Sequence, residues 1–141
     1  MVRCVYVEPK DYLNQIKHVK SDIQSRVRER NELRSAVEMK TTSYNADKVQ
    51  EGGAGRFDDK YMKYVEASES INKKIDELID LKMQISNEID MLEKSEHRIV
   101  LRMRYINLES FEKIAVMLGY DMRHIHRMHG TALIEFGKIM S

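Results

Sequence analysis

The chain has 141 residues, of which 33% are charged and 7% aromatic, with one proline, no tryptophan and a formal net charge of +1. This length fits one domain, or one small domain with an extended element, and excludes a large multidomain assembly. The composition is nearer to that of helical bundles than to that of β-sandwiches or barrels, so we expect no all-β fold. The total charge conceals an acidic middle, because residues 41–95 carry twelve acidic and eight basic side chains.

Residues 9–39 are predicted to form one long helix. Pro9 suits a first helical turn, and neither glycine nor another proline follows it in this stretch. Apolar residues recur at helical spacing, although Arg26 and Arg30 occupy two positions of the same stripe. Residues 40–57 lose this periodicity and hold three glycines within four positions, so we expect a flexible Gly-rich loop at about 40–57.

A second long helix follows, with the strongest periodicity of the chain. From Tyr61 to Leu92, stripe positions alternate three and four residues apart, which predicts a helix of roughly 35 residues. Such helices are marginal in water without a partner on their apolar stripe. We therefore expect a long antiparallel helical hairpin (coiled coil) over residues 1–95. The same stripes could pair between chains instead, and we expect a homo-oligomer, with a dimer favoured.

Residues 96–141 change to three short helices. The first covers residues 96–106 and breaks at Asn107, whereas Ser110 and Asp121 are the expected N-caps of the second and third helices. Two short helices cross steeply when a small residue lies at the crossing, a glycine forms the turn and branched residues fill the wedge. The residues in these roles are Ala115, Gly119, Ile114, Leu118 and Ile125. The sequence thus predicts an all-α fold that ends in a helix-turn-helix domain.

Residues 122–137 are the predicted recognition helix, whose N-terminal half would enter the major groove of double-stranded DNA. Arg123 and Arg127 lie one turn apart and can each grip a guanine edge or a phosphate, while Ile125, Met128 and Leu133 are expected to face inward. Arg102 and Arg104 are either supporting charges or partners of acidic residues in the hairpin. The predicted DNA-binding residues are Met122, Arg123, His124, His126, Arg127, Ser110 and Lys113.

Metal and enzyme chemistry are the alternatives for this segment. Of His124, His126 and His129, only the last two share a helix face, so we expect no metal site. The chain has no P-loop, no G-x-G-x-x-G, no H-E-x-x-H and no G-x-S-x-G, so we expect neither an enzyme nor a cofactor. Cys4 is the only cysteine, and no apolar run reaches the roughly 18 residues of a membrane helix, which favours a cytoplasmic protein with no membrane partner.

The C-terminal segment resembles region 4 of sigma-70-type factors, through Arg98-Ile-Val-Leu-Arg-Met-Arg-Tyr, residues 110–120 and the closing Ala132-Leu-Ile-Glu-Phe. With two long helices joined by a loop that contains Asp47-Lys-Val-Gln and glycines, the whole chain is similar to the phage-encoded RinA/ArpU-like regulators of late transcription. This resemblance implies sequence-specific binding at a phage or prophage promoter in a bacterial host cell and activation through host RNA polymerase. Such regulators often carry Gly-Leu-Ser where this chain has Leu108-Glu109-Ser110, so the turn is expected to rest on Asn107.

Two further functions fit the same pattern. A small terminase subunit also joins a helix-turn-helix to an oligomerising helical hairpin, but it recognises phage packaging DNA as a ring. A protein-only, sigma-like adaptor would bind polymerase or another factor and never contact DNA. The number of subunits distinguishes a terminase ring from a dimeric regulator. Binding to polymerase that survives loss of Arg123 and Arg127 would identify the adaptor.

Overall fold

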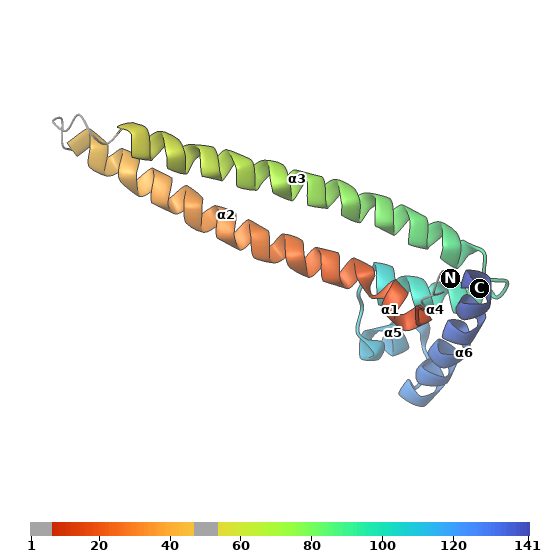
Figure 1. Ribbon diagram of the computed structural model, residues 1–141. Coiled ribbons are helices and arrows are strands. Elements are labelled where there is room, and N and C mark those ends of the chain that lie inside the picture. Colours follow the sequence, from red (N-terminus) through yellow and green to blue (C-terminus); the bar gives the residue numbers. More distant parts are fainter. Residues whose placement is uncertain (1–6, 47–53) are drawn as a thin grey trace. The chain divides into compact units, whose positions relative to one another are not determined.

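A computed structural model describes residues 7–46 and 54–141, with side chains over 7–39 and 59–141, and every element in these ranges is helical (Figure 1). The elements are α1 (Pro9–Leu13), α2 (Gln15–Ala46), α3 (Ala54–Asp90), α4 (Ser95–Leu101), the π-helical η1 (Arg102–Ile106), α5 (Phe111–Leu118) and α6 (Met122–Met140). The expected all-α class is confirmed for these residues. No helix among them is both long enough and apolar enough to cross a lipid bilayer.

The first predicted helix, over residues 9–39, differs from the structure at two points. Asn14 separates α1 from α2, although its backbone N–H still donates to the Lys10 carbonyl at 3.0 Å. The helix then continues to Ala46 instead of ending near residue 39. Residues 40–46 contain no glycine or proline, and a loss of apolar periodicity does not by itself stop a helix.

The loop predicted at about 40–57 is therefore wrong at both of its ends. Residues 40–46 belong to α2, and residues 54–57 belong to α3. The remaining residues, 47–53, lie outside the described part of the chain, and they include the Asp47-Lys-Val-Gln motif. The second long helix has 37 residues, close to the predicted length.

The chain divides into two compact units. Unit 1 comprises residues 1–19 and 78–141, and unit 2 comprises residues 20–77. The predicted boundary at residue 95 concerns where a DNA-binding domain begins, and it stays a prediction.

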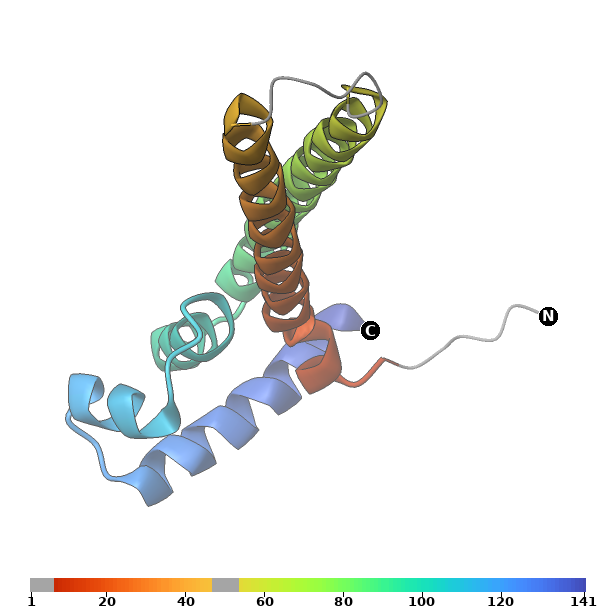
Figure 2. The ribbon, with the colours of Figure 1, turned by 90° about the vertical axis from the view of Figure 1, so that its left-hand side faces the viewer.

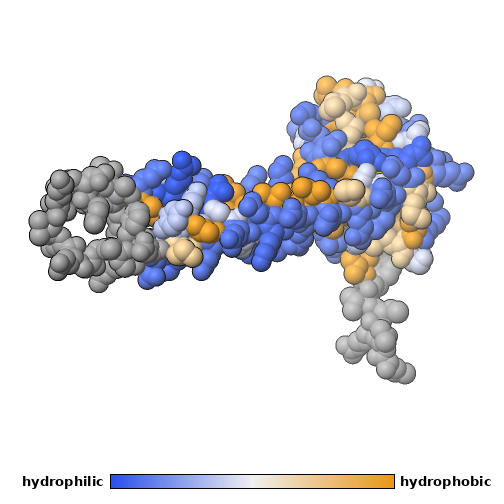
Figure 3. Space-filling view, turned by 90° about the horizontal axis from the view of Figure 1, so that it is seen from above, coloured by the Kyte–Doolittle hydropathy of each residue, from blue (hydrophilic) through white to orange (hydrophobic). Residues whose placement is uncertain are grey.

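Unit 2 consists of parts of α2 and α3 that run side by side in opposite directions (Figure 1). Ile71 is the only buried residue among the described side chains of this unit. Arg26 pairs with Asp22 at 3.1 Å and donates to Ser70 Oγ at 3.1 Å, whereas Arg30 Nε is buried without a hydrogen-bond partner among the described residues. Hydrophilic residues cover most of the unit 2 surface visible in Figure 3, with a narrow apolar stripe among them.

Unit 1 contains a large apolar cluster drawn from distant parts of the sequence. Its buried members are each at most 3% exposed, and they come from the N-terminal helices, the end of α3 with the following turn, α4, η1 and α6. They are Leu13, Ile16, Ile85, Ile89, Leu92, Leu101, Tyr105, Ala132 and Phe136. The last helices of the chain therefore share one core with residues near its beginning.

A small cluster in the same unit holds α5 against η1 and the first half of α6. Met103, Ile114, Ala115 and Ile125 are its buried members, with Phe111 and Leu118 packed against it. The side chains expected between the two short helices are thus buried or half-buried. Of the other residues expected to face inward, Met128 is buried, and Leu133 is half-buried against the large cluster.

The connection into α5 differs from the prediction. The helix ends at Asn107 as expected, but its last turn, η1, is π-helical. The left-handed residue is Leu108, with a φ of 57°, whereas Asn107 has a φ of −82°. The Glu109 amide closes the reversal by donating to the Met103 carbonyl at 3.0 Å. A non-glycine residue in this conformation costs about 1–2 kcal/mol, so the turn rests on a strained Leu108.

Candidate nucleic-acid interface

The ends of α5 are fixed by local hydrogen bonds. The Ser110 hydroxyl accepts from the backbone amide of Lys113 at 3.2 Å, which satisfies one of the free amides of the first turn. At the other end Gly119 has a φ of 72°, and the Tyr120 amide donates to the Ala115 carbonyl at 3.0 Å. A glycine accepts this left-handed conformation without steric cost. Both predicted ends of the helix are confirmed.

The start of α6 is fixed in the same way. Asp121 Oδ1 accepts from the His124 amide at 2.7 Å, as the sequence predicts for an N-cap. From there α6 runs to Met140, three residues beyond the predicted end at residue 137. Figure 2 shows α5, the short turn and α6 following one another within unit 1.

One side of α6 carries two unpaired arginines. Arg123 and Arg127 are exposed, and neither forms an ion pair or a side-chain hydrogen bond with any residue that the structure describes. They are four residues apart, so they project from the same side of the helix. Met122, 37% exposed, and the exposed His126 lie beside them. We call these four residues the arginine face.

The other predicted DNA-binding residues are less free. His124 is half-buried, with its ring centroid 4.5 Å from that of Tyr120. The Lys113 ammonium pairs with Glu109 Oε2 at 3.0 Å, and the Ser110 hydroxyl is engaged in the α5 cap. These three side chains are therefore already engaged with neighbouring residues, whereas those of Arg123 and Arg127 are not.

Arg102 and Arg104 are both engaged within unit 1. Arg102 forms an ion pair with Asp90 of the second long helix and donates to Ser86 Oγ at 2.8 Å. Arg104 donates to the Glu109 carbonyl at 3.0 Å, and its guanidinium lies 4.1 Å from the ring centroid of Phe111. Of the two roles considered for Arg102, pairing with an acidic residue of that helix is the one observed.

The charges nearest to the two short helices leave the first half of α6 more positive than the start of α5, although the exposed Asp121 adds a negative charge at the N-cap of α6. Glu112, exposed in the first turn of α5, adds a negative charge, and the Lys113 charge is offset by Glu109. Arg123 and Arg127 therefore supply the unpaired positive charges of this surface. An anionic partner is attracted to the first half of α6 more strongly than to the start of α5.

Behind the arginine face lies a buried histidine whose role the sequence did not indicate. His129 is 8% exposed, and its Nε2 lies 2.7 Å from the Tyr105 hydroxyl. Its ring also meets the edge of Phe111, with centroids 4.9 Å apart. Burial, reinforced by the positive charges of Lys10, Arg104 and His126, lowers the pKa of His129 to about 4. His129 is therefore neutral at physiological pH.

The sequence did contain a signal for this burial. Ile125, His129, Ala132 and Phe136 recur at helical spacing on one side of α6, and the other three are apolar. A histidine within such a stripe is expected in the core. Among the described residues, no group of three or more histidine, cysteine, aspartate or glutamate side chains is placed to hold a metal ion.

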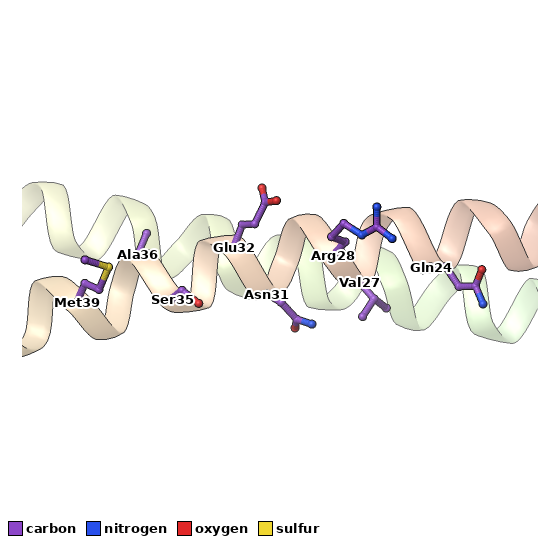
Figure 4. A pocket seen from close by; sticks show the side chains of 8 residues that line it. All are labelled: Gln24, Val27, Arg28, Asn31, Glu32, Ser35, Ala36 and Met39. Carbon is purple, nitrogen blue, oxygen red and sulfur yellow. The ribbon is translucent and has the colours of Figure 1, made fainter.

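A surface hollow lies along α2, outside the candidate interface. One helix supplies every side chain that lines it, and α3 passes behind that helix in Figure 4. The lining residues are Gln24, Val27, Arg28, Asn31, Glu32, Ser35, Ala36 and Met39. Ligand sites are usually concave and enclosed by several elements, so this hollow is a solvated helix surface.

Comparison with known families gives one match. Residues 38–136 match the model of a family described as "Protein of unknown function (DUF1492)", and this range covers more than half of the chain. The chain therefore belongs to this family. The match includes α3 to α5 and the whole arginine face. No curated protein and no solved structure matches the chain significantly.

Proposed function

We propose that this member of the DUF1492 family is a sequence-specific, double-stranded-DNA-binding regulator of phage or prophage transcription. In this proposal α5, the turn and α6 act as a helix-turn-helix, and α6 is the recognition helix. The observation that carries the proposal is the arginine face, because Arg123 and Arg127 are exposed and unpaired within the described residues. The opposite side of α6 is anchored by Ile125 and Met128, which are buried.

The arginine face has side chains suited to the major groove. Each arginine can donate two parallel hydrogen bonds to the O6 and N7 atoms of guanine, or bind a phosphate. Met122 at the start of the helix can contact a thymine methyl group, and His126 can donate to a base edge or phosphate. These contacts would combine positioning on the backbone with the reading of sequence.

Two unpaired arginines provide few phosphate contacts for one copy of the chain. Non-specific affinity grows with the number of neutralised phosphates, so useful binding requires a second anchor. A homo-oligomer, with a dimer favoured, would supply a second arginine face. Host RNA polymerase would supply the anchor if the protein activates late genes, as the resemblance to RinA/ArpU-like regulators implies.

One observation favours the protein-only adaptor as a second candidate. Val116 is 82% exposed and Met117 is 58% exposed, both on the outer side of α5. Neighbouring exposed apolar residues often mark a protein contact. An adaptor would use this surface and leave the arginines without a function.

Selection of bound sequences from random duplex DNA with the full chain tests the proposal. We expect an enriched motif of a few base pairs, repeated at a fixed spacing if two copies bind together. The absence of any enriched motif at low salt would contradict the proposal. A selected motif that matches phage packaging DNA, together with a mass in solution that corresponds to a ring, would instead identify the small terminase subunit.

A further inference from the structure

Helix α6 is packed on one side by two separate clusters. Its N-terminal half contributes Ile125 to the small cluster, and its C-terminal half contributes Ala132 and Phe136 to the large cluster. His129 lies between them on the same side of the helix, because the four positions follow helical spacing. The boundary between the two clusters therefore falls at His129.

His129 contacts both clusters. Its Nε2 lies 2.7 Å from the hydroxyl of Tyr105, a buried member of the large cluster, and the two rings stack with centroids 5.6 Å apart. On its other side it meets Phe111, which packs against the small cluster. Phe111 also lies 4.7 Å from the ring of His126 in the arginine face. A continuous set of ring contacts thus joins Tyr105 to the arginine face.

Gly130 follows directly after this boundary. It lies in the interior of α6, and a Cβ built on it would meet no atom within 4 Å. No steric reason therefore requires a glycine here. Because glycine is the most flexible residue in a helix interior, Gly130 makes α6 easier to deform at the point where its two halves meet different clusters.

We propose that Tyr105 and His129 are positioning residues, whose hydrogen bond latches the N-terminal half of α6 to the large cluster. Gly130 is the hinge at which α6 yields when the latch opens. The effect on DNA rests on the function proposed above, whereas the latch itself follows from the packing. Its consequence is that the orientation of Arg123 and Arg127 depends on a buried bond that contacts neither of them.

The latch is sensitive to acid. The titratable and charged groups that face His129 are Tyr105 and Arg104 of η1, Lys10 of α1 and His126 of α6. Burial and the cationic groups lower the pKa of His129 to about 4 while the latch is closed. An open latch returns the imidazole towards its ordinary pKa of about 6.5. The open state therefore binds more protons, and opening becomes more frequent as the pH falls from about 6.5 towards 4.

Amide hydrogen exchange of the full chain tests the latch with a matched pair of variants. Tyr105→Phe removes the hydroxyl and keeps the ring, and we expect about tenfold faster exchange over residues 111–128. Tyr12→Phe is the control, because the Tyr12 hydroxyl donates to Glu88 Oε1 at 2.8 Å elsewhere in unit 1. It should leave exchange over residues 111–128 unchanged. Adding Gly130→Ala to Tyr105→Phe should slow exchange again, because alanine stiffens the hinge.

A pH series provides a readout that a purely structural role would not change. After correction for intrinsic exchange rates, opening of the wild-type segment should increase between pH 6.5 and 4.5. His129→Gln retains a side chain that can bond the Tyr105 hydroxyl but does not titrate, so its opening should not change over this range. A pH response in His129→Gln equal to that of the wild type would overturn the assignment of His129.

Two other results would overturn the proposal. One is equal acceleration by Tyr105→Phe over residues 85–89 and residues 111–128, which would show a general loss of stability. The other is no acceleration at all. If the wild type binds no DNA, the proposed function fails while hydrogen exchange still decides the latch. If Tyr105→Phe opens the segment but leaves the affinity for selected DNA unchanged, the positioning role is wrong.

Discussion

Unit 1 and unit 2 are both helical, but different interactions stabilise them. Every described buried residue except Ile71 lies in unit 1. The described side chains of unit 2 instead form local pairs such as Arg26 with Asp22, and pairs of this kind contribute about 0.2–0.5 kcal/mol each. The difference shows that long helices do not mark the most stable part of this chain. Tertiary burial is concentrated in unit 1, mainly in the large cluster.

The largest expected effect on stability comes from removing a side chain from the large cluster. Phe136 is fully buried, so Phe136→Ala should lower the free energy of unfolding of unit 1 by about 3–5 kcal/mol. Ile134→Ala on the same helix is the control, because Ile134 is 64% exposed. Its effect should stay within about 0.5 kcal/mol in urea titrations followed by circular dichroism. Similar losses in the two variants would contradict the asymmetry between core and surface in α6.

A pH titration of stability separates the two units further. His129 has a lowered pKa of about 4 in the folded state, so its neutral form is favoured by folding. Its contribution is complete above the unfolded pKa of about 6.5 and is lost as the pH falls towards 4, by up to about 3 kcal/mol. Residues 20–77 contain no histidine, so unit 2 should lose little stability between pH 6.5 and 5.

Urea titrations at pH 7 and pH 5, followed residue by residue by NMR, would measure this difference. The His129→Gln variant should reduce the loss in unit 1. An equal loss of stability in both units would refute the role of His129 in the pH dependence.

The two glycines of α6 should respond differently to alanine. Gly130→Ala should stabilise unit 1 by about 0.5–1 kcal/mol, because the added methyl group meets nothing and the helix propensity improves. At Gly137 a Cβ would lie 3.1 Å from Pro9 Cγ, so this proline ring must shift. Gly137→Ala should therefore raise the midpoint of thermal unfolding less than Gly130→Ala does. The reverse order would show that α1 does not pack against α6 as described.

The smallest expected effect concerns the strained turn before α5. Leu108→Gly removes the steric cost of the left-handed conformation but loses the partial burial of the leucine and increases the freedom of the unfolded chain. These terms nearly cancel, and we expect a net gain of about 0.5 kcal/mol. Asn107→Gly is the control, since Asn107 has an ordinary φ of −82°. The Asn107→Gly variant should lower the free energy of unfolding. Destabilisation by Leu108→Gly as large as that by Asn107→Gly would contradict the strain assigned to this turn.

The sequence predicted those parts of unit 1 that depend on local chemistry. Ser110 and Asp121 bond amides three residues ahead, and Gly119 adopts a conformation that other residues avoid, so neighbouring residues determine these helix ends. The inward side of the two short helices followed from spacing alone. The prediction that Arg123 and Arg127 are exposed followed in turn, because they lie on the side of the same helix that does not face inward.

Features that depend on tertiary contacts were not predicted. The π-helical η1 brings Tyr105 into the large cluster, and the sequence does not show which core a side chain will enter. The left-handed Leu108 follows from that turn, whereas local preference pointed to Asn107. His129 was considered as a metal ligand because histidines cluster nearby in sequence, but its partner Tyr105 is 24 positions away. The ion pair of Lys113 with Glu109 was also missed, although these two residues are only four positions apart in the sequence.

The most direct test of the central claim compares the arginine face with arginines elsewhere in the chain. Fluorescence anisotropy would measure the affinity of selected duplex DNA for the wild type, for Arg123→Ala with Arg127→Ala, and for Arg28→Ala with Arg34→Ala in unit 2. Both double variants lose the same formal charge. We expect the α6 variant to lose at least about tenfold in affinity and its sequence preference, and the unit 2 variant to retain both. Equal affinities in all three proteins would contradict DNA recognition by this face.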